Sequence, residues 1–169
     1  MIEEKRKALD ALDVLMQHHR EVESLFSEFE YLHKNGRDAT RVMEAACAEI
    51  KIHDAIENDI FYPAVSDAAG EEGIDALLDD AEDSHDEALD LIEDLEDAGA
   101  DAAKRHPQFM LLIAQVKQHI MDEETELFPR VRKLEQLDLA ALGSEMKARE
   151  TELVAEAELA EAGEKSAQA

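Results

Sequence analysis

The stretch KIHDAIENDIFYPAV, residues 51–65, contains the motif that decides the fold of this chain. It has a histidine in a helix-like apolar pattern, a glutamate four residues after the histidine and a proline ten residues after it. The stretch QHIMDEETELFPRV, residues 118–131, has the same residues at the same offsets. Residues four apart are neighbours on one face of a helix, so each stretch presents an imidazole and a carboxylate together. The chain carries one helical motif twice.

The duplication extends beyond these stretches, because an offset of 66 residues relates two halves of the chain. It relates His19 to His85, Leu25 to Leu91, His53 to His119, Glu57 to Glu123, Pro63 to Pro129 and Val65 to Val131. Each of the four histidines fills a gap near the middle of an apolar stripe with helical period. His18 would map onto Ser84, so the repeat favours His19 over His18 as the functional histidine.

The apolar period predicts four helices of about 25 to 30 residues joined by short polar turns. We expect the first three to end near HKNGRD (33–38), SDAAGEEG (66–73) and EDAGAD (96–101), and the fourth to begin at Pro107. A fifth, shorter helix is expected at about 138–161, followed by a low-complexity end that frays. Short turns make neighbouring helices antiparallel.

The predicted fold class is therefore all-α: an antiparallel up-down-up-down four-helix bundle with an additional C-terminal helix. We expect the bundle and its metal site to occupy residues 1–135, and the C-terminal helix with an acidic tail to occupy residues 136–169.

Charge and composition exclude several classes of function. The formal net charge of −26 argues against binding nucleic acid or an anionic membrane surface. A single cysteine, Cys47, excludes an intramolecular disulfide and a cysteine-rich metal site. The N-terminus lacks an apolar signal region, and the longest apolar run, FMLLIAQV (109–116), is too short to span a bilayer. We expect a soluble cytoplasmic protein.

The histidines and glutamates predict a metal site in the middle of the bundle. Mid-helix positions of antiparallel neighbours meet at one level, so the four histidines should converge in one layer of the core. A single inward histidine is more often a satisfied core or surface residue. Burying four imidazoles and two carboxylates without partners is costly, however, and a metal ion removes that cost.

The ligand types narrow the choice of metal. Imidazole and carboxylate without thiolate suit iron, manganese or zinc, and six side chains are too many for one tetrahedral zinc. Two octahedral ions need about twelve ligand positions, of which the imidazoles, two bridging glutamates and a bridging oxide or hydroxide fill about ten. One position on each ion stays open for a small ligand such as dioxygen, peroxide or nitric oxide.

Four segments together resemble the hemerythrin-like HHE cation-binding domain family: QHHREVESLF, IHDAIENDIFYP, EDSHDEAL and QHIMDEETELFP. The resemblance covers about residues 9–133 and implies a four-helix bundle with two oxo- or hydroxo-bridged non-haem iron ions. It implies that the terminal ligands are His19, His53, His85 and His119, and that the bridges are Glu57 and Glu123. This ligand set is similar to that of the iron–sulfur repair proteins of the same superfamily.

The chain departs from the oxygen-carrying hemerythrins of that superfamily. Those have a His-x-x-x-His pair on the third helix, whereas here Leu89 and Ala81 lie four residues after and before His85. Their last helix has an aspartate five residues after its histidine, where this chain has Glu124. The departures favour a reactive or sensing site over a plain oxygen carrier.

Some further residues have two readings. Asp54 and Glu82 could add a carboxylate to the site, but roles on a solvated face are expected. Tyr62, which corresponds to Phe128, is expected to pack in the core, with a phenol near the metal as the second reading. We expect His18, His33 and His106 at the surface, and Pro63 and Pro129 to end or kink their helices. Metal removal should leave the buried glutamates with raised carboxyl pKa values.

Three functions remain open at this stage. The first is a di-iron protein that binds or reacts with dioxygen, peroxide or nitric oxide, in the response to or sensing of redox or nitrosative stress. The second is an iron-binding or iron-delivery module without turnover, for example one that donates iron for iron–sulfur cluster repair. The third is a structural bundle whose acidic surface binds a partner. The oligomeric state stays open.

Overall fold

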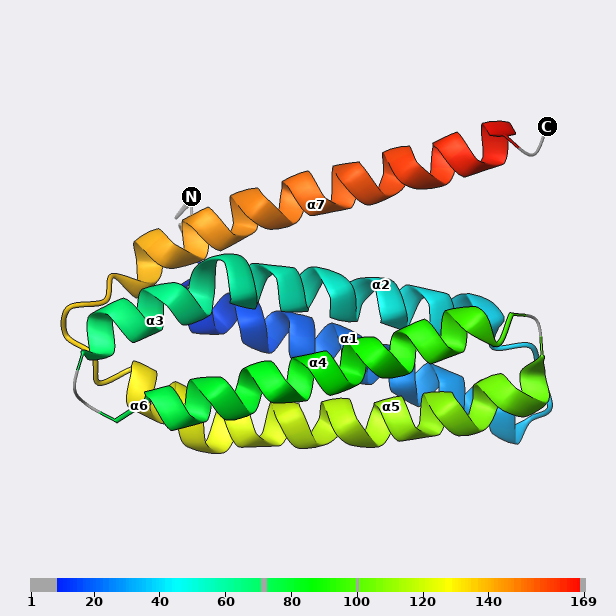
Figure 1. Ribbon diagram of the computed structural model, residues 1–169, viewed down its shortest axis with the longest axis horizontal. Coiled ribbons are helices and arrows are strands. Elements are labelled where there is room, and N and C mark those ends of the chain that lie inside the picture. Colours follow the sequence, from blue (N-terminus) through cyan, green and yellow to red (C-terminus); the bar gives the residue numbers. More distant parts are fainter. Residues whose placement is uncertain (1–8, 71–72, 100, 168–169) are drawn as a thin grey trace, which may run out of the picture.

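The structure, a computed structural model, describes residues 9–70, 73–99 and 101–167, and their regular secondary structure is helical throughout. The elements, with η for π-helical segments, are α1 (Ala11–Lys34), α2 (Thr40–Ile56), η1 (Glu57–Phe61), α3 (Tyr62–Ala69), α4 (Asp75–Asp97), α5 (Ala102–Asp122), η2 (Glu123–Leu127), α6 (Phe128–Val131) and α7 (Leu139–Ala167). Four rods lie side by side, and α7 crosses one face of them (Figure 1). The predicted fold class, a helical bundle with an extra C-terminal helix, is confirmed.

The rods follow the predicted duplication. The first and third are α1 and α4, with 24 and 23 residues, slightly shorter than expected. The second rod runs through α2, η1 and α3 without a break, and the fourth runs through α5, η2 and α6. Helix α1 packs on α2, and α4 packs on α5, so each half of the repeat is a helical hairpin.

Helix ends are fixed by short side chains that bind free backbone groups. At the start of α1, Asp10 accepts a hydrogen bond from the backbone N–H of Asp13, and Asp13 accepts one from that of Asp10. At the start of α5, Asp101 accepts from the N–H of Ala103. The expectation that this helix begins at Pro107 was wrong. Asp101 caps the helix earlier, and the exposed Pro107 lies in its second turn.

The two prolines that follow the repeated His-x-x-x-Glu motif do not end their helices, so of the two expected outcomes, an end or a kink, the end was wrong. Pro63 and Pro129 instead follow π-helical segments, and the chain stays helical beyond both. The N–H of Tyr62 donates to the carbonyl of Glu57, and the N–H of Phe128 donates to that of Glu123. Proline has no backbone N–H and cannot donate the hydrogen bond that a regular α-helix requires at its position. The π turn before each proline lets the chain stay helical without that bond.

Two hydrophobic clusters fill the bundle, one toward each end. The first combines residues of all four rods with α7 and includes Leu12, Phe61, Val65, Leu127 and Met146. The second includes Phe26, Phe29, Ile92, Phe109 and Leu112. His19, His53, His85 and Glu123 lie between the two clusters in sequence. Glu57 follows Ile56 of the first cluster and His119 precedes Ile120 of the second, so a polar layer lies near mid-bundle.

Helix α7 contacts α1, α2 and η1. Its Leu142 and Met146 are buried in the first cluster. A Cβ at Gly143 would lie 2.7 Å from the backbone of Asp10, so only glycine permits this close approach. The helix continues to Ala167 rather than ending near 161, and its later residues Val154 and Leu159 are exposed. Within the described ranges, no helix is both long and apolar enough to cross a membrane.

Candidate metal centre

All six residues predicted to bind metal converge at mid-bundle. His19 comes from α1, His53 from α2, Glu57 from η1, His85 from α4, His119 from α5 and Glu123 from η2. Each is buried, with Glu57 fully enclosed. They form two groups of four whose donor atoms lie within 4.8 Å of one another. One group contains His53, Glu57, His85 and His119, and the other contains His19, His53, Glu57 and Glu123.

The two carboxylates lie at the centre of the histidine cluster. The Oε2 atom of Glu57 is 3.0 Å from His53 Nε2 and 2.9 Å from His85 Nε2. The Oε2 atom of Glu123 is 3.2 Å from His19 Nε2 and 3.3 Å from His119 Nε2. Each glutamate therefore faces a histidine of its own rod and a histidine of another rod. If each group held one metal ion, a carboxylate that lies between the groups could bridge the two ions.

The donor atoms of the six residues satisfy one another only in part, and metal ions would satisfy them better. Six buried donor atoms of these residues have no hydrogen-bond partner among the described residues: His19 Nε2, His53 Nδ1, His53 Nε2, Glu57 Oε1, His85 Nδ1 and Glu123 Oε2. Some of them lie near an opposite charge but without hydrogen-bond geometry. Unsatisfied buried polar atoms cost free energy. Imidazole and carboxylate are ligands that iron, manganese and zinc accept.

Carboxylates outside the six residues hold two of the histidine rings. Asp54 Oδ1 lies 2.8 Å from Nδ1 of His85, and Glu124 Oε1 lies 2.8 Å from Nδ1 of His19. Arg20 in turn binds Glu124. A carboxylate on the far nitrogen of a ligating histidine fixes the ring and makes it a stronger ligand. Asp54 thus belongs to the site as a supporting group, whereas Glu82 is exposed.

Tyr62 contributes more than the core packing expected for it. Its hydroxyl lies 3.0 Å from Glu57 Oε2 and 2.9 Å from Glu123 Oε1, in position to donate to either carboxylate. In a regular α-helix, position 62 lies about 140° around the axis from position 57. The π turn widens the helix and brings Tyr62 back to the face of Glu57. The repeat partner, Phe128, stacks on the ring of His19 instead.

The expectation that His18 is at the surface was wrong. His18 is 4% exposed, and its Nε2 lies 3.3 Å from Oε2 of Glu150 on α7. The internal repeat lacks a counterpart of α7, so it could not indicate that this helix covers His18. His33 is exposed as expected, whereas His106 is half-buried with its ring centroid 4.7 Å from that of His33. Both lie near Phe29.

The histidines differ in how readily they take a proton. Burial lowers the pKa of His119, but the charges and contacts of Glu123 and Glu57 outweigh it and raise the pKa to about 10. Burial likewise lowers the pKa of His85, but contacts with Asp54 and Glu57 raise it to about 9. The pKa of His19 is also raised, since Glu123 outweighs burial. For His53, burial is the larger effect and lowers the pKa.

The glutamates stay ionised, which corrects the expectation of raised carboxyl pKa values. Burial raises the pKa of Glu57, but His53, His119 and His85 together hold it well below its usual range. Burial and the charge of Glu57 raise the pKa of Glu123, yet His119 and His19 lower it to about 2. Positive charge is therefore stabilised between the carboxylates, carried by protons on the histidines when no metal is bound.

Two cavities reach the six residues. A small one of about 20 Å³ lies on the histidine side, and its walls include Val22, Ile50, Ala88, Val116 and Ile120. All four predicted histidine ligands and His18 also line it. A groove of about 210 Å³ lies between α4 and the α5–η2 rod and reaches His119 and Glu123. The small cavity has room for about one water-sized molecule.

Residues 10–131 match the sequence family described as the hemerythrin HHE cation binding domain. The chain belongs to this family. A solved structure of a hemerythrin HHE cation binding domain-containing protein from Mycobacterium kansasii is similar, with a TM-score of 0.71 and 24% sequence identity. The match covers 86% of this chain and 87% of that one, and it shows a shared fold. No curated protein matches the chain at a significant level.

Membership of the HHE family agrees with the sequence resemblance and with the buried histidine and glutamate cluster. The match ends at residue 131, the last residue of α6. Helix α7 lies outside it, although α7 supplies Glu150 next to His18 at the edge of the centre.

Proposed function

We propose that the protein is a non-haem di-iron protein that binds or reacts with dioxygen, peroxide or nitric oxide, in the response to or sensing of redox or nitrosative stress. The observation that carries the proposal is the pair of overlapping four-residue groups, which share His53 and Glu57. Two sites that share ligands suit two ions held close together. Each ion would have imidazole and carboxylate ligands and about one open position.

The residues would divide the work as follows. The terminal ligands would be His19, His53, His85 and His119, with Glu57 and Glu123 as bridges. The iron pair would supply electrons and open coordination positions for a small ligand. Asp54 and Glu124 hold the rings of His85 and His19 from behind. The hydroxyl of Tyr62 lies beside both carboxylates, in position to donate a hydrogen bond to either one and so offset part of its negative charge.

The small cavity supports a ligand of few atoms. Its volume is about 20 Å³, and most of its wall beyond the histidines is aliphatic. Such a wall excludes bulk water and leaves a small uncharged molecule as the favoured occupant. A larger organic substrate does not fit this space.

The proposal predicts about two iron ions per chain in fully loaded protein, with an oxo-bridge charge-transfer band in the diferric state. Metal analysis and an absorption spectrum of protein purified from its native host check this. One tightly held zinc ion per chain would contradict it. Consumption of peroxide or nitric oxide by the iron-loaded protein would then identify the reactive role.

A second function, iron binding or delivery without turnover, is favoured by the groove that connects His119 and Glu123 with the surface. Protein with this function would release iron to an acceptor or chelator and leave peroxide and nitric oxide unchanged. The two activities are measured on the same iron-loaded sample.

A further inference from the structure

The groove between α4 and the α5–η2 rod leads from the protein surface to two of the predicted ligands. His119 and Glu123 line it, and both are more than nine-tenths buried. The Oε2 atom of Glu123 has no hydrogen-bond partner among the described residues. Ser84 and His119 line both this groove and the small cavity. The groove therefore ends at an unsatisfied metal-binding group.

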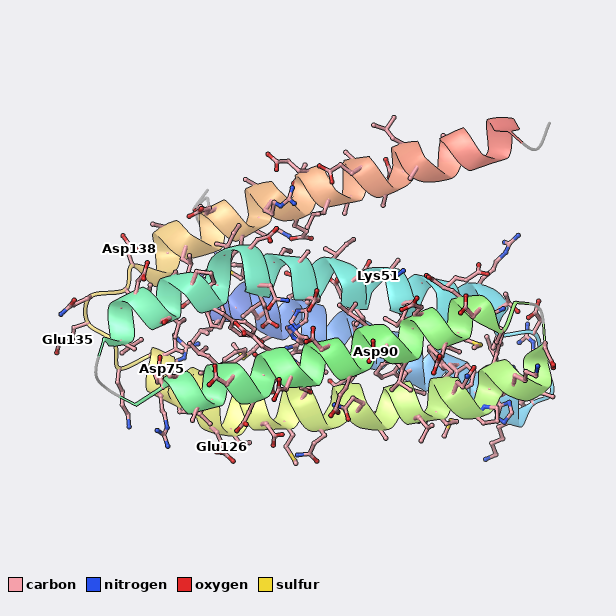
Figure 2. The ribbon with its side chains drawn as sticks, in the orientation of Figure 1. Lys51, Asp75, Asp90, Glu126, Glu135 and Asp138 are labelled. Atoms are coloured by element: carbon pink, nitrogen blue, oxygen red, sulfur yellow. The ribbon has the colours of Figure 1, made fainter. Side chains whose placement is uncertain are left out.

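Three carboxylates surround the outer part of the groove: Asp80 on α4, Asp122 on α5 and Glu126 on η2. All three residues are exposed, and Glu126 lies on the side of the bundle away from α7 (Figure 2). Among the described residues, none of the three forms an ion pair with a basic side chain. Asp122 accepts a hydrogen bond from the neutral amide of Gln118. Their negative charge is therefore not cancelled by a neighbouring cation.

In the other half of the repeat, the surface equivalent to the outer part of this groove is covered. The 66-residue offset relates Asp80 to Val14, Asp122 to Ile56 and Glu126 to Ile60. Val14 and Ile56 are fully buried, and Ile60 packs beside them in the cluster that contains Leu142 and Met146 of α7. One half thus has an aliphatic surface covered by α7. The equivalent surface of the other half is open and acidic.

The same comparison applies deeper in the groove. Ser84 occupies the position that His18 occupies in the covered half. The imidazole of His18 fills that position and contacts Glu150 of α7. The smaller Ser84, which accepts a hydrogen bond from Gln115, leaves space beside His119.

We propose that this groove is the route by which a divalent cation reaches and leaves the buried centre, with Asp80, Asp122 and Glu126 drawing the cation in. The inference rests on the proposed metal centre and adds how that centre is loaded. Carboxylate oxygens replace part of the water shell of a hard cation, and a cleft of one charge sign raises the arrival rate of an opposite charge by about 10- to 1,000-fold. Glu123, whose Oε2 atom has no hydrogen-bond partner among the described residues, would then provide the first permanent ligand.

A charge-neutralised variant, Asp80→Asn with Asp122→Asn and Glu126→Gln, tests the route. Metal-free full-length protein is mixed with Fe²⁺ without oxygen, and unbound iron is trapped with a chelator at successive times. We expect uptake about tenfold slower than in the unmodified protein at low ionic strength, with the same final iron count. The difference should shrink as salt is added, because salt screens exposed charges.

A neighbouring groove provides a matched control. Asp75, Asp79 and Glu82 line a cleft of about 290 Å³ beside Tyr62, and Asp75 is visible at the start of α4 in Figure 2. The variant Asp75→Asn with Asp79→Asn and Glu82→Gln changes the net charge equally. We expect it to take up iron at the unmodified rate. Circular dichroism establishes that both variants fold.

The possible results separate the route from the proposed function. An unchanged uptake rate in the first variant would overturn the route, as would equal slowing in both variants or slowing in the control alone. A lower final iron count would make the three carboxylates ligands rather than a route, which also overturns it. Failure of the unmodified protein to bind iron would contradict the proposed function itself.

Discussion

At the scale of single residues, the centre depends on which side chains face the two glutamates. His18 and His19 are adjacent and both buried, yet they point to different partners. The Nε2 atom of His19 lies 3.2 Å from Glu123, whereas that of His18 lies 3.3 Å from Glu150 on α7. Burial alone therefore does not separate the predicted ligand His19 from His18, and the carboxylate that each one faces distinguishes the two.

This difference predicts that His19→Ala loses most of the bound iron, while His18→Ala keeps it. Removing His18 should instead lower the free energy of unfolding by about 1–3 kcal/mol, because Glu150 loses a buried partner and the space left is not refilled. Iron analysis and urea unfolding of both variants measure the two effects. His33→Ala, at an exposed site, serves as the control for both. Equal iron loss in the two variants would show that the repeat does not define the ligands.

The sequence predicted the six central residues because the 66-residue repeat relates them in three pairs, so each residue is supported by its counterpart. It did not predict the positions that break the repeat. Tyr62 faces the glutamates only because η1 adds a wider turn, and a regular helical period places it elsewhere. Likewise, Asp54 and Glu124 follow His53 and Glu123 directly in sequence, but their contacts cross to other rods and depend on how those rods pack.

At the scale of secondary-structure elements, α7 is the part of the molecule that the repeat does not describe. Sequence period predicted the helix itself, and its start at Leu139 agrees with the expected start at about 138. The face that it covers follows from tertiary contacts, chiefly Leu142 and Met146 in the first hydrophobic cluster. Arg149 adds an exposed ion pair with Asp59 of η1 at 3.3 Å. Helix α7 therefore closes one half of the bundle and leaves the other open.

Gly143 provides a test of how α7 is held. A Cβ at this position would lie 2.7 Å from Leu9 O and 2.8 Å from Ala11 N, and these backbone atoms cannot move aside as a side chain can. We expect Gly143→Ala to lower the free energy of unfolding by about 1–3 kcal/mol, because α7 must shift from α1. Urea unfolding measures the change.

Gly163 on the same helix is the matched control, because nothing lies within 4 Å of a Cβ added there. Gly163→Ala should be neutral or should stabilise the protein by up to about 1 kcal/mol, through helix propensity alone. If both substitutions stabilise, α7 does not pack closely on α1 in solution.

At the scale of the whole molecule, the bundle is built around a layer of opposite charges. Two glutamates lie in the middle of a chain with a formal net charge of −26, and the histidines around them supply the compensating charge. When a metal ion binds, it replaces protons on those histidines, so metal affinity and protonation are linked. The overall excess of carboxylates favours both metal ions and protons near the centre.

This linkage predicts how the stability of the metal-free protein depends on pH. The pKa values of His85 and His119 are raised from the usual 6.5 to about 9 and about 10, so their contribution is complete below pH 6.5 and is lost as the pH rises through 9 to 10. The pKa of Glu123 is lowered from 4.5 to about 2, so its contribution is present above pH 4.5 and is lost as the pH falls towards 2. The lowered pKa of His53 opposes folding on the acid side of 6.5.

The metal-free protein should therefore be most stable near pH 6 and should lose stability steadily from pH 7 to 10, while the iron-loaded protein should change much less over that range. In the loaded protein the metal takes the place of the histidine protons, so raising the pH removes no compensating charge. Urea unfolding of both forms at several pH values measures the difference, with His33→Ala as a control for titration outside the centre. Metal-free protein whose stability stays constant or rises between pH 7 and 10 would show that the folded centre holds no more protons than the unfolded chain in that range, against the raised histidine pKa values.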